Sequence, residues 1–218
     1  WERFVGLSFG LGLMLGLMSI DINAAGIKNL EESGEIAIDA TNFPDEMFRQ
    51  WVLNNVDKNG STTLSEQEIS GCTSISIFGR GIKNLEGIGI FTNLTSLSCT
   101  NTELKSLDIS KNSALKSLYC RSNRLSSLNV SKNSKLEVLL CGGNQLSNLD
   151  VSKNSELSTL DCYGNPLGSL DVSKNTALKY LECGSNQLTE LNVTNNPALT
   201  HLWCGTNRLL VLDLSANS

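Results

Sequence analysis

The chain has 218 residues, of which 40% are hydrophobic, so it can hold one large domain or two small ones and has the composition of an ordinary soluble protein. Its formal net charge is −5, and its lysines and arginines are scattered rather than clustered. This charge pattern argues against a nucleic-acid partner.

Residues 1–25 are predicted to be a secretory signal peptide. The stretch "FVGLSFGLGLMLGL" (Phe4–Leu17) is apolar and uncharged, and Ile22–Ala25 supplies the small residues of a cleavage site. A retained membrane anchor is the alternative, although the run is short and rich in glycine. Because the chain begins at Trp1 and stops in mid-pattern at Ser218, we expect a fragment of a longer exported protein. Membrane contact is then expected only through export or an anchor outside the fragment.

Residues 26–40 are predicted to be a linker, and residues 41–71 a small helical cap. Thr41 or Asn42 is expected to cap a helix that has Pro44 in its first turn. The apolar face of this helix is predicted to consist of Met47, Phe48, Trp51, Val52 and Val56. The first coil of a repeat protein exposes its core, so we expect this face to cover the coil that follows.

The loop after this helix, "DKNGSTTLSEQE" (Asp57–Glu68), resembles an EF-hand or dockerin-type calcium loop. The resemblance implies the candidate metal ligands Asp57, Asn59, Ser61, Thr63, Ser65 and Glu68. Two features depart from the family: Thr62 occupies the sixth position, where glycine makes the sharp turn, and only two of the six candidates are carboxylates. Calcium is therefore the possible cofactor, and a degenerate loop that keeps its shape without metal is the alternative.

Residues 72–218 are predicted to form one repeat domain that is cut short at the C-terminus. An irregular first coil of 22 residues, Cys72–Asn93, precedes five whole units of 21 residues, Leu94–Ala198, and an incomplete sixth, Leu199–Ser218. The same-slot cysteines are Cys99, Cys120, Cys141, Cys162, Cys183 and Cys204. Each unit contains L-x-x-L-x-C-x-x-N-x-L, as in Leu115–Leu125, and a second half of similar shape, L-x-x-L-D-V-x-x-N. One coil is therefore predicted to consist of two strand-and-turn halves without a helix. Such a coil cannot bury its own leucines, so neighbouring coils must stack.

This repeat resembles the leucine-rich repeat signature, in particular the short repeats of bacterial secreted surface proteins of the internalin-like and BspA-like type. The resemblance implies a β-rich solenoid: a right-handed coil or arch with a parallel sheet and a small α-helical cap at its N-terminal end. It also implies that the protein is secreted or lies on the surface of a bacterial cell, and that its partner is a protein or a glycan.

Two repeated columns admit a chemical interpretation. The cysteines share strand parity with leucine, so buried free thiols that pack as small hydrophobic side chains are the main interpretation. Disulfides between coils and a column of soft-metal thiolates are the alternatives. The second column is predicted to be a solvated face with local hydrogen bonds rather than a metal site. It consists of Asp108, Asn129, Asp150, Asp171, Asn192 and Asp213.

No catalytic arrangement is evident, and we expect no enzyme. His201 is the only histidine, and it is predicted to face outward with Trp203 while Cys204 faces the core, so no Cys–His pair forms. Function is expected on the outward side chains of the sheet. The candidate ligand-binding residues are Tyr119, Asp161, Tyr163, Tyr180, Glu182, His201 and Trp203. They predict an extracellular binding or adhesion module that uses the concave face of the solenoid; a targeting module of a larger secreted enzyme is the alternative.

Overall fold

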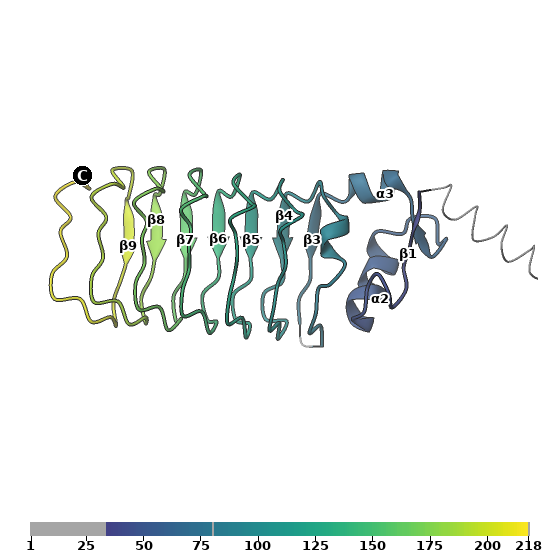
Figure 1. Cartoon of the computed structure of the whole chain (residues 1–218), viewed down its shortest axis with the longest axis horizontal. Coiled ribbons are helices and arrows are strands. Elements are labelled where there is room, and N and C mark those ends of the chain that lie inside the picture. The colour runs from purple at the N-terminus through teal and green to yellow at the C-terminus, as the bar shows by residue number, and fades with distance from the viewer. Residues whose placement is uncertain (1–33, 80, 218) are drawn as a thin grey trace, which may run out of the picture.

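The structure is a computed structural model that describes residues 34–79 and 81–217, so the predicted signal peptide lies outside the described residues. The described chain forms a solenoid whose coils stack along one axis beside a small helical cap (Figure 1). One side of the solenoid is a seven-stranded parallel sheet in the order β3-β4-β5-β6-β7-β8-β9. This architecture confirms the predicted leucine-rich repeat fold.

Each coil contributes one short strand to this sheet. The strands are β3 (Ser74–Ser76), β4 (Ser96–Ser98), β5 (Ser117–Tyr119), β6 (Val138–Leu140), β7 (Thr159–Asp161), β8 (Tyr180–Glu182) and β9 (His201–Trp203). Equivalent residues of neighbouring coils pair directly: Leu97 pairs with Leu118, and Leu118 pairs with Leu139. The 21-residue repeat therefore sets the register of the sheet from β4 onward.

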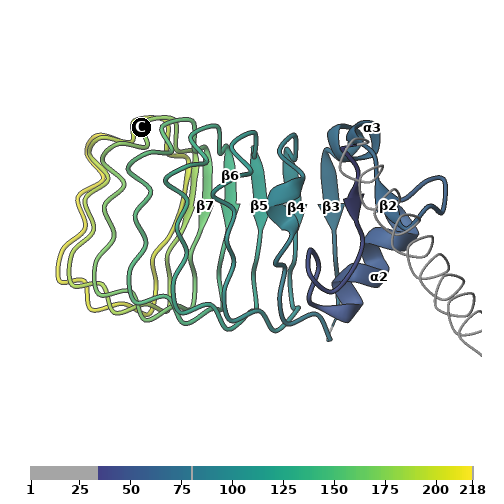
Figure 2. The same ribbon diagram turned by 45° about the vertical axis from the view of Figure 1, so that its right-hand side comes forward.

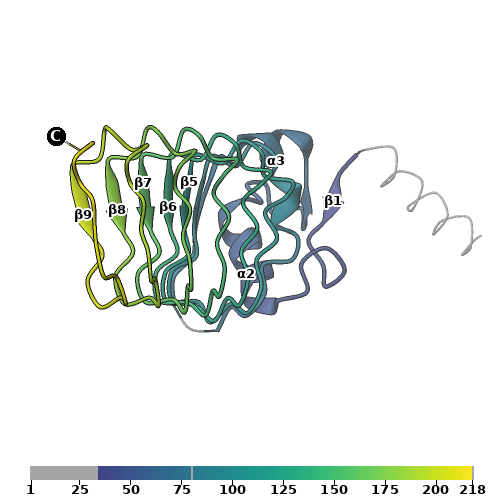
Figure 3. The same cartoon turned by 60° about the vertical axis from the view of Figure 1, so that its left-hand side comes forward.

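The second half of each coil differs from the prediction, because it forms no strand in the described residues. Figures 2 and 3 show strands on one side of the solenoid and irregular backbone on the other. The backbone there closes tight turns within its own coil: Asn133 N–H donates to the Val130 carbonyl, and Leu136 N–H donates to the Asn133 carbonyl, both at 3.0 Å. These turns take up the Val130 carbonyl and the N–H groups of Asn133 and Leu136, so these groups do not join a ladder between coils.

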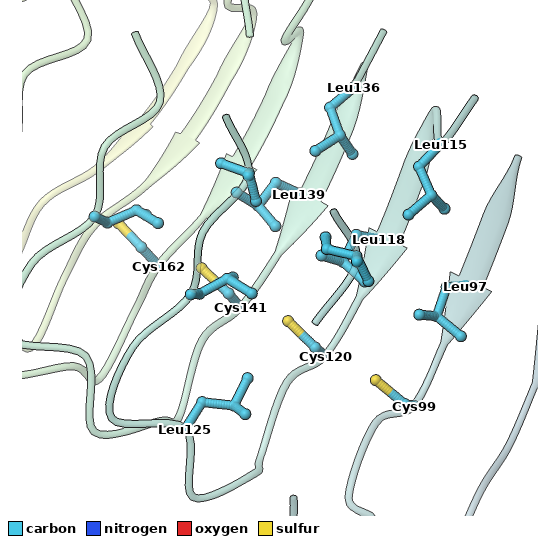
Figure 4. Packing of buried hydrophobic residues seen from close by; sticks show 14 of the residues in the cluster. Leu97, Cys99, Leu115, Leu118, Cys120, Leu125, Leu136, Leu139, Cys141 and Cys162 are labelled. Atoms are coloured by element: carbon cyan, nitrogen blue, oxygen red, sulfur yellow. The ribbon is translucent and has the colours of Figure 1, made fainter. Parts of the chain in front are cut away.

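The core is made of the repeated leucines, valines and cysteines. Leu97, Leu118 and Leu139 are fully buried, and so are Cys99 and Cys120. Figure 4 shows these side chains stacked in columns, with each sulfur next to the sulfur of the neighbouring coil. Burying a leucine stabilises a fold by about 1.5–3 kcal/mol, so the columns supply much of the stability that one coil alone lacks.

One asparagine column is fully hydrogen-bonded inside the solenoid. Asn144 Nδ2 donates to the carbonyls of Cys120 and Cys141, at 3.0 and 2.9 Å, and its Oδ1 accepts from the N–H of Leu125 at 3.1 Å. Asn123, Asn165, Asn186 and Asn207 repeat this pattern. Thr102 holds the same slot in the earlier coil and donates its hydroxyl to the Cys99 carbonyl at 2.8 Å. The side chains thus bond backbone groups at a turn between strands.

A second asparagine column is only partly hydrogen-bonded. Asn154 Nδ2 donates to the carbonyls of Val130 and Asn133, at 3.1 and 2.8 Å, but its buried Oδ1 has no partner among the residues that the structure describes. The same orphaned oxygen occurs at Asn112, Asn133, Asn175, Asn196 and Asn217. The two columns therefore carry different numbers of hydrogen bonds per side chain.

The cap contains helix α2 (Glu46–Asn55), whose N-cap is Asp45 rather than Thr41 or Asn42. Asp45 Oδ1 accepts from Phe48 N–H at 3.0 Å, and Oδ2 accepts from Lys83 N–H at 2.9 Å. Its carboxylate thus caps the helix and holds it against the first coil, which explains why it outcompetes the earlier candidates. Within the predicted apolar face, Phe48 and Val52 are buried, but Met47 is 55% exposed, so the prediction for Met47 was wrong.

The remaining elements complete the cap and the first coil. Strand β1 (Ile36–Ala37), at the end of the predicted linker, pairs antiparallel with β2 (Thr63–Leu64) and so belongs to the cap. Helix α3 (Glu66–Gly71) leads into β3, and the 3₁₀ helix η1 (Ile88–Ile90) lies in the first coil. In residues 34–79 and 81–217 we find no helix that combines the length and apolar character needed to cross a membrane.

Candidate binding face of the sheet

The outer face of the sheet carries three columns of side chains that point away from the core. In each strand from β4 to β8 a buried leucine separates two partly exposed positions, except that the second one is buried in β7. Register pairing places Tyr119, Leu140, Asp161, Glu182 and Trp203 in one column. The other two columns hold Ser96, Ser117, Val138, Thr159, Tyr180 and His201, and Thr100, Arg121, Gly142, Tyr163, Gly184 and Gly205.

Chemical character changes along this face. The strands nearest the cap present small hydroxyls, including Ser96 and Ser98, whereas the later strands present acidic and aromatic groups. Six of the seven predicted ligand-binding residues lie on or just after β7, β8 and β9; Tyr119 lies on β5, two strands before Asp161. The register therefore brings most of the predicted residues together.

The centre of the later region is an ion pair between Arg121 and Asp161. Arg121 Nε donates to Asp161 Oδ2, and its Nη2 lies 3.7 Å from Glu182 Oε2. The arginine belongs to a coil two strands earlier, so its side chain must cross the intervening coil. Gly142 occupies that coil at the equivalent position, and a Cβ there would lie 2.8 Å from Asp161 Oδ2. The absence of a side chain at Gly142 is therefore what allows this contact.

Asp161 is less accessible than the sequence suggests. It is 2% exposed, and its Oδ1 accepts from the N–H of Tyr163 at 2.8 Å. The alternation of the strand correctly predicts an outward side chain, but Arg121 covers it. Asp161 therefore does not act as an open acceptor for a ligand; it fixes the position of the Arg121 guanidinium, which remains partly exposed.

Two aromatic side chains stack on the strands that follow, β8 and β9. The rings of Tyr180 and His201 stack with centroids 5.9 Å apart and an interplanar angle of 29°. Tyr180 hydroxyl donates to Glu182 Oε2 at 3.2 Å, and burial, with the nearby Glu182 charge, raises the pKa of this phenol. These contacts hold both rings and the Glu182 carboxylate in one arrangement before any partner binds.

Tyr163 and Trp203 are large exposed aromatic side chains of the face, at 47% and 65%, and His201 is exposed as well. A Cβ at Gly184 would lie 3.4 Å from Tyr163 Cδ2, so the Tyr163 ring lies beside a second glycine of the same column. Arg121, Gly142 and Gly184 were not among the predicted binding residues. The available signal was the presence of glycine in a slot that elsewhere holds a large side chain.

The cysteines of the column pack as buried side chains in the hydrophobic core. All seven cysteines are free thiols; five are buried, and Cys72 and Cys204 are half-buried. Burial raises the pKa of Cys99 to about 12 and that of Cys183 to about 12, so these thiols stay protonated at neutral pH. Because the nucleophile and the metal ligand are the thiolate, burial suppresses both reactions. His201 points outward, away from this column, as predicted.

The outer column of Asp and Asn has the predicted local hydrogen bonds. The Asp108 carboxylate accepts from the N–H of Ser110 at 2.9 Å, and this bond lowers the pKa of Asp108. Asn129, Asp150, Asp171, Asn192 and Asp213 accept from the residue two positions later in the same way. These side chains stabilise turns on the solvated face.

In the predicted calcium loop, backbone N–H groups donate hydrogen bonds to both carboxylates, Asp57 and Glu68. Asp57 Oδ1 accepts from Gly60 and Ser61 N–H, at 2.8 and 3.2 Å, and Oδ2 accepts from Thr62 N–H at 3.0 Å. Glu68 forms a capping box with Ser65 and accepts from Lys58 N–H at 2.8 Å. Backbone hydrogen bonding from Ser65 is the main reason that the pKa of Glu68 is lowered.

The other candidate ligands of the loop are also engaged. Asn59 Oδ1 accepts from Ser61 N–H at 2.8 Å, and the Ser61 and Thr63 hydroxyls lie 3.0 Å apart. Thr62 adopts φ = 65°, the left-handed conformation that glycine supplies in the family. In the part of the chain that the structure describes, no group of three or more His, Cys, Asp or Glu could hold a metal. The candidate ligands are thus already hydrogen-bonded within the loop, and a cation would have to displace those bonds.

Comparison with known proteins places these features in context. No family model matches the chain. Over 71 residues it is 37% identical to Internalin J of Listeria monocytogenes serotype 4b (strain F2365), a match covering 33% of this chain and 8% of that protein. The solved functional domain of InlJ from Listeria monocytogenes, described as including a cysteine ladder, matches at TM-score 0.66 and 32% identity over 85% of this chain and 46% of that one.

A plant protein shares the architecture as well. The leucine-rich repeat ectodomain of the membrane receptor kinase GASSHO1/SCHENGEN3 from Arabidopsis thaliana, solved in complex with CASPARIAN STRIP INTEGRITY FACTOR 2, matches at TM-score 0.54 and 26% identity. That match covers 57% of this chain and 17% of the receptor. The chain therefore spans less than half the length of each of these proteins. Together the comparisons support an internalin-like leucine-rich repeat.

Proposed function

We propose that this internalin-like leucine-rich repeat is an extracellular recognition module that binds a protein partner on the outer face of β7, β8 and β9. The observation that carries the proposal is the exposure of Trp203 and Tyr163 beside a preformed ion pair, Arg121–Asp161. Exposed aromatic and arginine side chains dominate the energetics of protein interfaces. Side chains that are already ordered also lose less conformational entropy on binding.

A protein partner is favoured over a glycan by the composition of this face. Glu182 and Tyr180 bond each other, and Asp161 is covered, so few carboxylates or hydroxyls remain free to accept from sugar hydroxyls. The accessible groups include the rings of Tyr163 and Trp203, the His201 imidazole and the Arg121 guanidinium, which suit apolar and acidic side chains of a protein. The plant receptor ectodomain was solved in complex with CASPARIAN STRIP INTEGRITY FACTOR 2, which supports the use of this architecture for recognition.

The test needs a ligand screen and a matched pair of variants. The chain is screened against a panel of extracellular matrix proteins and a glycan array, and each binder is then measured against Trp203→Ala and Ser98→Ala. Both substitutions lie in the same outward column, but Ser98 stands on the β4 strand near the cap. We expect Trp203→Ala to weaken binding by about tenfold or more, and Ser98→Ala to leave it within about twofold. Equal affinity of both variants would place the site elsewhere.

A further inference from the structure

The sheet has an open edge at its first strand, β3. In β4, Ser96 N–H donates to the Thr73 carbonyl at 3.2 Å, and the Ser98 carbonyl accepts from Ile77 N–H at 2.8 Å. On the other side of β4, the Thr95 carbonyl and the Cys99 N–H bond to β5. Backbone groups of alternate residues in one strand therefore bond opposite neighbours, as the ladder of a parallel sheet requires.

The same alternation in β3 leaves Ser74 and Ser76 without a neighbour. Thr73 and Ile77 bond forward to β4, so the N–H and C=O groups of the two serines point away from β4, toward the cap. Within residues 34–79 and 81–217, no hydrogen bond to these four backbone groups occurs. A strand edge in this state is a template for pairing with another extended chain.

A groove lies along this edge. Its volume is about 820 Å³, and its walls include Trp51, Asn55, Lys58, Cys72, Ser74 and Ser76. Figure 1 shows β3 at the end of the sheet, followed by the helices of the cap. Both serines are exposed, while Trp51 and Cys72 are half-buried and give the groove an apolar wall. The groove therefore combines free backbone groups with a place for an apolar side chain.

Two charged side chains line the groove, Glu68 and Lys58, and only the carboxylate of Glu68 has partners that match its charge. Glu68 accepts from Lys58 N–H, Ser65 N–H and the Ser65 hydroxyl, at 2.8, 2.9 and 2.7 Å, so the acceptor capacity of its carboxylate is largely used. The Lys58 ammonium donates to the carbonyl of Asn55, and among the described residues it forms no ion pair. The unmatched group is thus a cation, which an acidic side chain of a ligand would complement.

We propose that this groove binds an extended peptide segment of a partner protein by strand addition to β3, with an acidic side chain of the peptide near Lys58. The hydrogen bonds of Ser74 and Ser76 would give the affinity, and the Trp51 wall and Lys58 would give the specificity, as in other cases of strand addition. The groove shares no residue with the face of β7–β9, so this proposal stands independently of the function proposed above.

The test uses a random dodecapeptide library displayed on phage, selected on the whole chain, with the enriched peptides then made synthetically. Ser76→Pro removes the N–H that points into the groove, whereas Ser76→Ala keeps it, and an edge strand tolerates proline better than a central one. We expect at least one peptide that binds Ser76→Pro about tenfold or more weakly and Ser76→Ala within about twofold. Lys58→Met should weaken the same peptide, and its binding should slow hydrogen exchange at the Ser74 and Ser76 amides.

Two further measurements keep the test decisive. Urea unfolding shows whether the Ser76→Pro variant is folded. If this variant is unfolded, the unmodified protein is tested with a peptide that is methylated on its backbone nitrogens, because methylation removes the hydrogen-bond donors of the peptide. The proposal is overturned if every enriched peptide binds both Ser76 variants equally, if the two amides show no slowing, or if no peptide is enriched. Trp51-dependent binding of a neutral glycan in place of a peptide would also overturn it.

Discussion

Arg121 and Asp161 are 40 residues apart in the chain, yet the guanidinium of one contacts the carboxylate of the other across an intervening coil. The contact passes over Gly142, whose missing side chain leaves the path open. It buries the carboxylate and leaves part of the arginine exposed, so the pair is both a structural contact and a part of the outer surface.

Gly142→Ala should therefore destabilise the protein and disturb this surface. The new Cβ would meet Asp161 Oδ2 at 2.8 Å, so the ion pair or the backbone must shift. Forcing a methyl group into a packed site typically costs about 1–3 kcal/mol, which urea unfolding would measure. Gly168→Ala is the matched control, because nothing lies within 4 Å of a Cβ there and the expected change is below about 0.5 kcal/mol. Equal stability of the two variants would contradict the packing argument.

The two asparagine columns should differ in their sensitivity to substitution. Asn144→Ala removes one donor from the Cys120 and Cys141 carbonyls, which still accept from Asn123 and Asn165, and it leaves the N–H of Leu125 without its side-chain acceptor. Asn154→Ala also removes one donor from each of two carbonyls, but the oxygen it removes has no hydrogen-bond partner among the described residues. Each lost hydrogen bond costs about 1 kcal/mol or more, so Asn144→Ala should be the more destabilising by about that amount. Urea unfolding of the two variants decides it, and an equal or reversed order would count against the assigned hydrogen bonds.

The buried thiols should make the protein sensitive to alkali. Burial raises the pKa of Cys99 from 9.0 to about 12 and raises those of Cys120, Cys141 and Cys162 well above 9.0. Above pH 9 the unfolded chain releases these protons while the folded chain retains them, so the unfolding free energy falls as pH rises. Each thiol contributes a slope of about 1.4 kcal/mol per pH unit, and this stability is fully present below pH 9.

Urea unfolding between pH 8 and pH 11 measures that slope directly. Cys141→Ala is the control, because it should reduce the slope by about one thiol while leaving neighbouring cysteines in place. Thiol labelling gives an independent check: the half-buried Cys72 and Cys204 should react first, and the five buried cysteines only on unfolding. An unfolded protein that yields no thiols would instead reveal disulfides between coils.

Calcium binding at Asp57–Glu68 should be weak. Only two of the six candidate ligands are carboxylates, and both accept hydrogen bonds from the loop itself, so a cation gains little charge and must displace existing contacts. We expect millimolar calcium to raise the melting temperature slightly and Glu68→Gln to abolish that rise. Glu66→Gln, in the same helical turn but outside the ligand positions, should leave it unchanged. Submicromolar affinity, or a calcium effect that survives Glu68→Gln, would refute this view of the loop.

Much of the repeat domain could be predicted because its signal is periodic. The spacing of Leu97 and Leu118 gave the register, and the shared parity of leucine and cysteine gave the buried side of each strand. The burial of Asp161 could not be predicted in this way. The alternation of a strand predicts whether a side chain points inward or outward. It does not predict that Arg121, from a coil two strands away, covers Asp161, a contact that requires glycine at position 142.

The cap shows the same limit of local reasoning. Thr41, Asn42 and Asp45 can all cap a helix, and no local rule chooses among them. Asp45 is used because its second oxygen accepts from Lys83 and Asn84 N–H, at 2.9 and 3.2 Å, in the first coil. That contact is tertiary, so it appears only once the cap has docked on the solenoid.

The register of the coils also has a consequence for how such a chain can change by duplication. The strands from β4 to β9 follow one another at intervals of 21 residues, so an added 21-residue unit should keep the register of the sheet wherever it is inserted. An insertion after β9 would lengthen the molecule and leave its surface chemistry as it was. An insertion between β5 and β7 would add about 4.8 Å to the separation of Arg121 and Asp161 and so break their contact. The number of repeat units between two side chains thus sets the distance between them, and so decides whether they can contact each other.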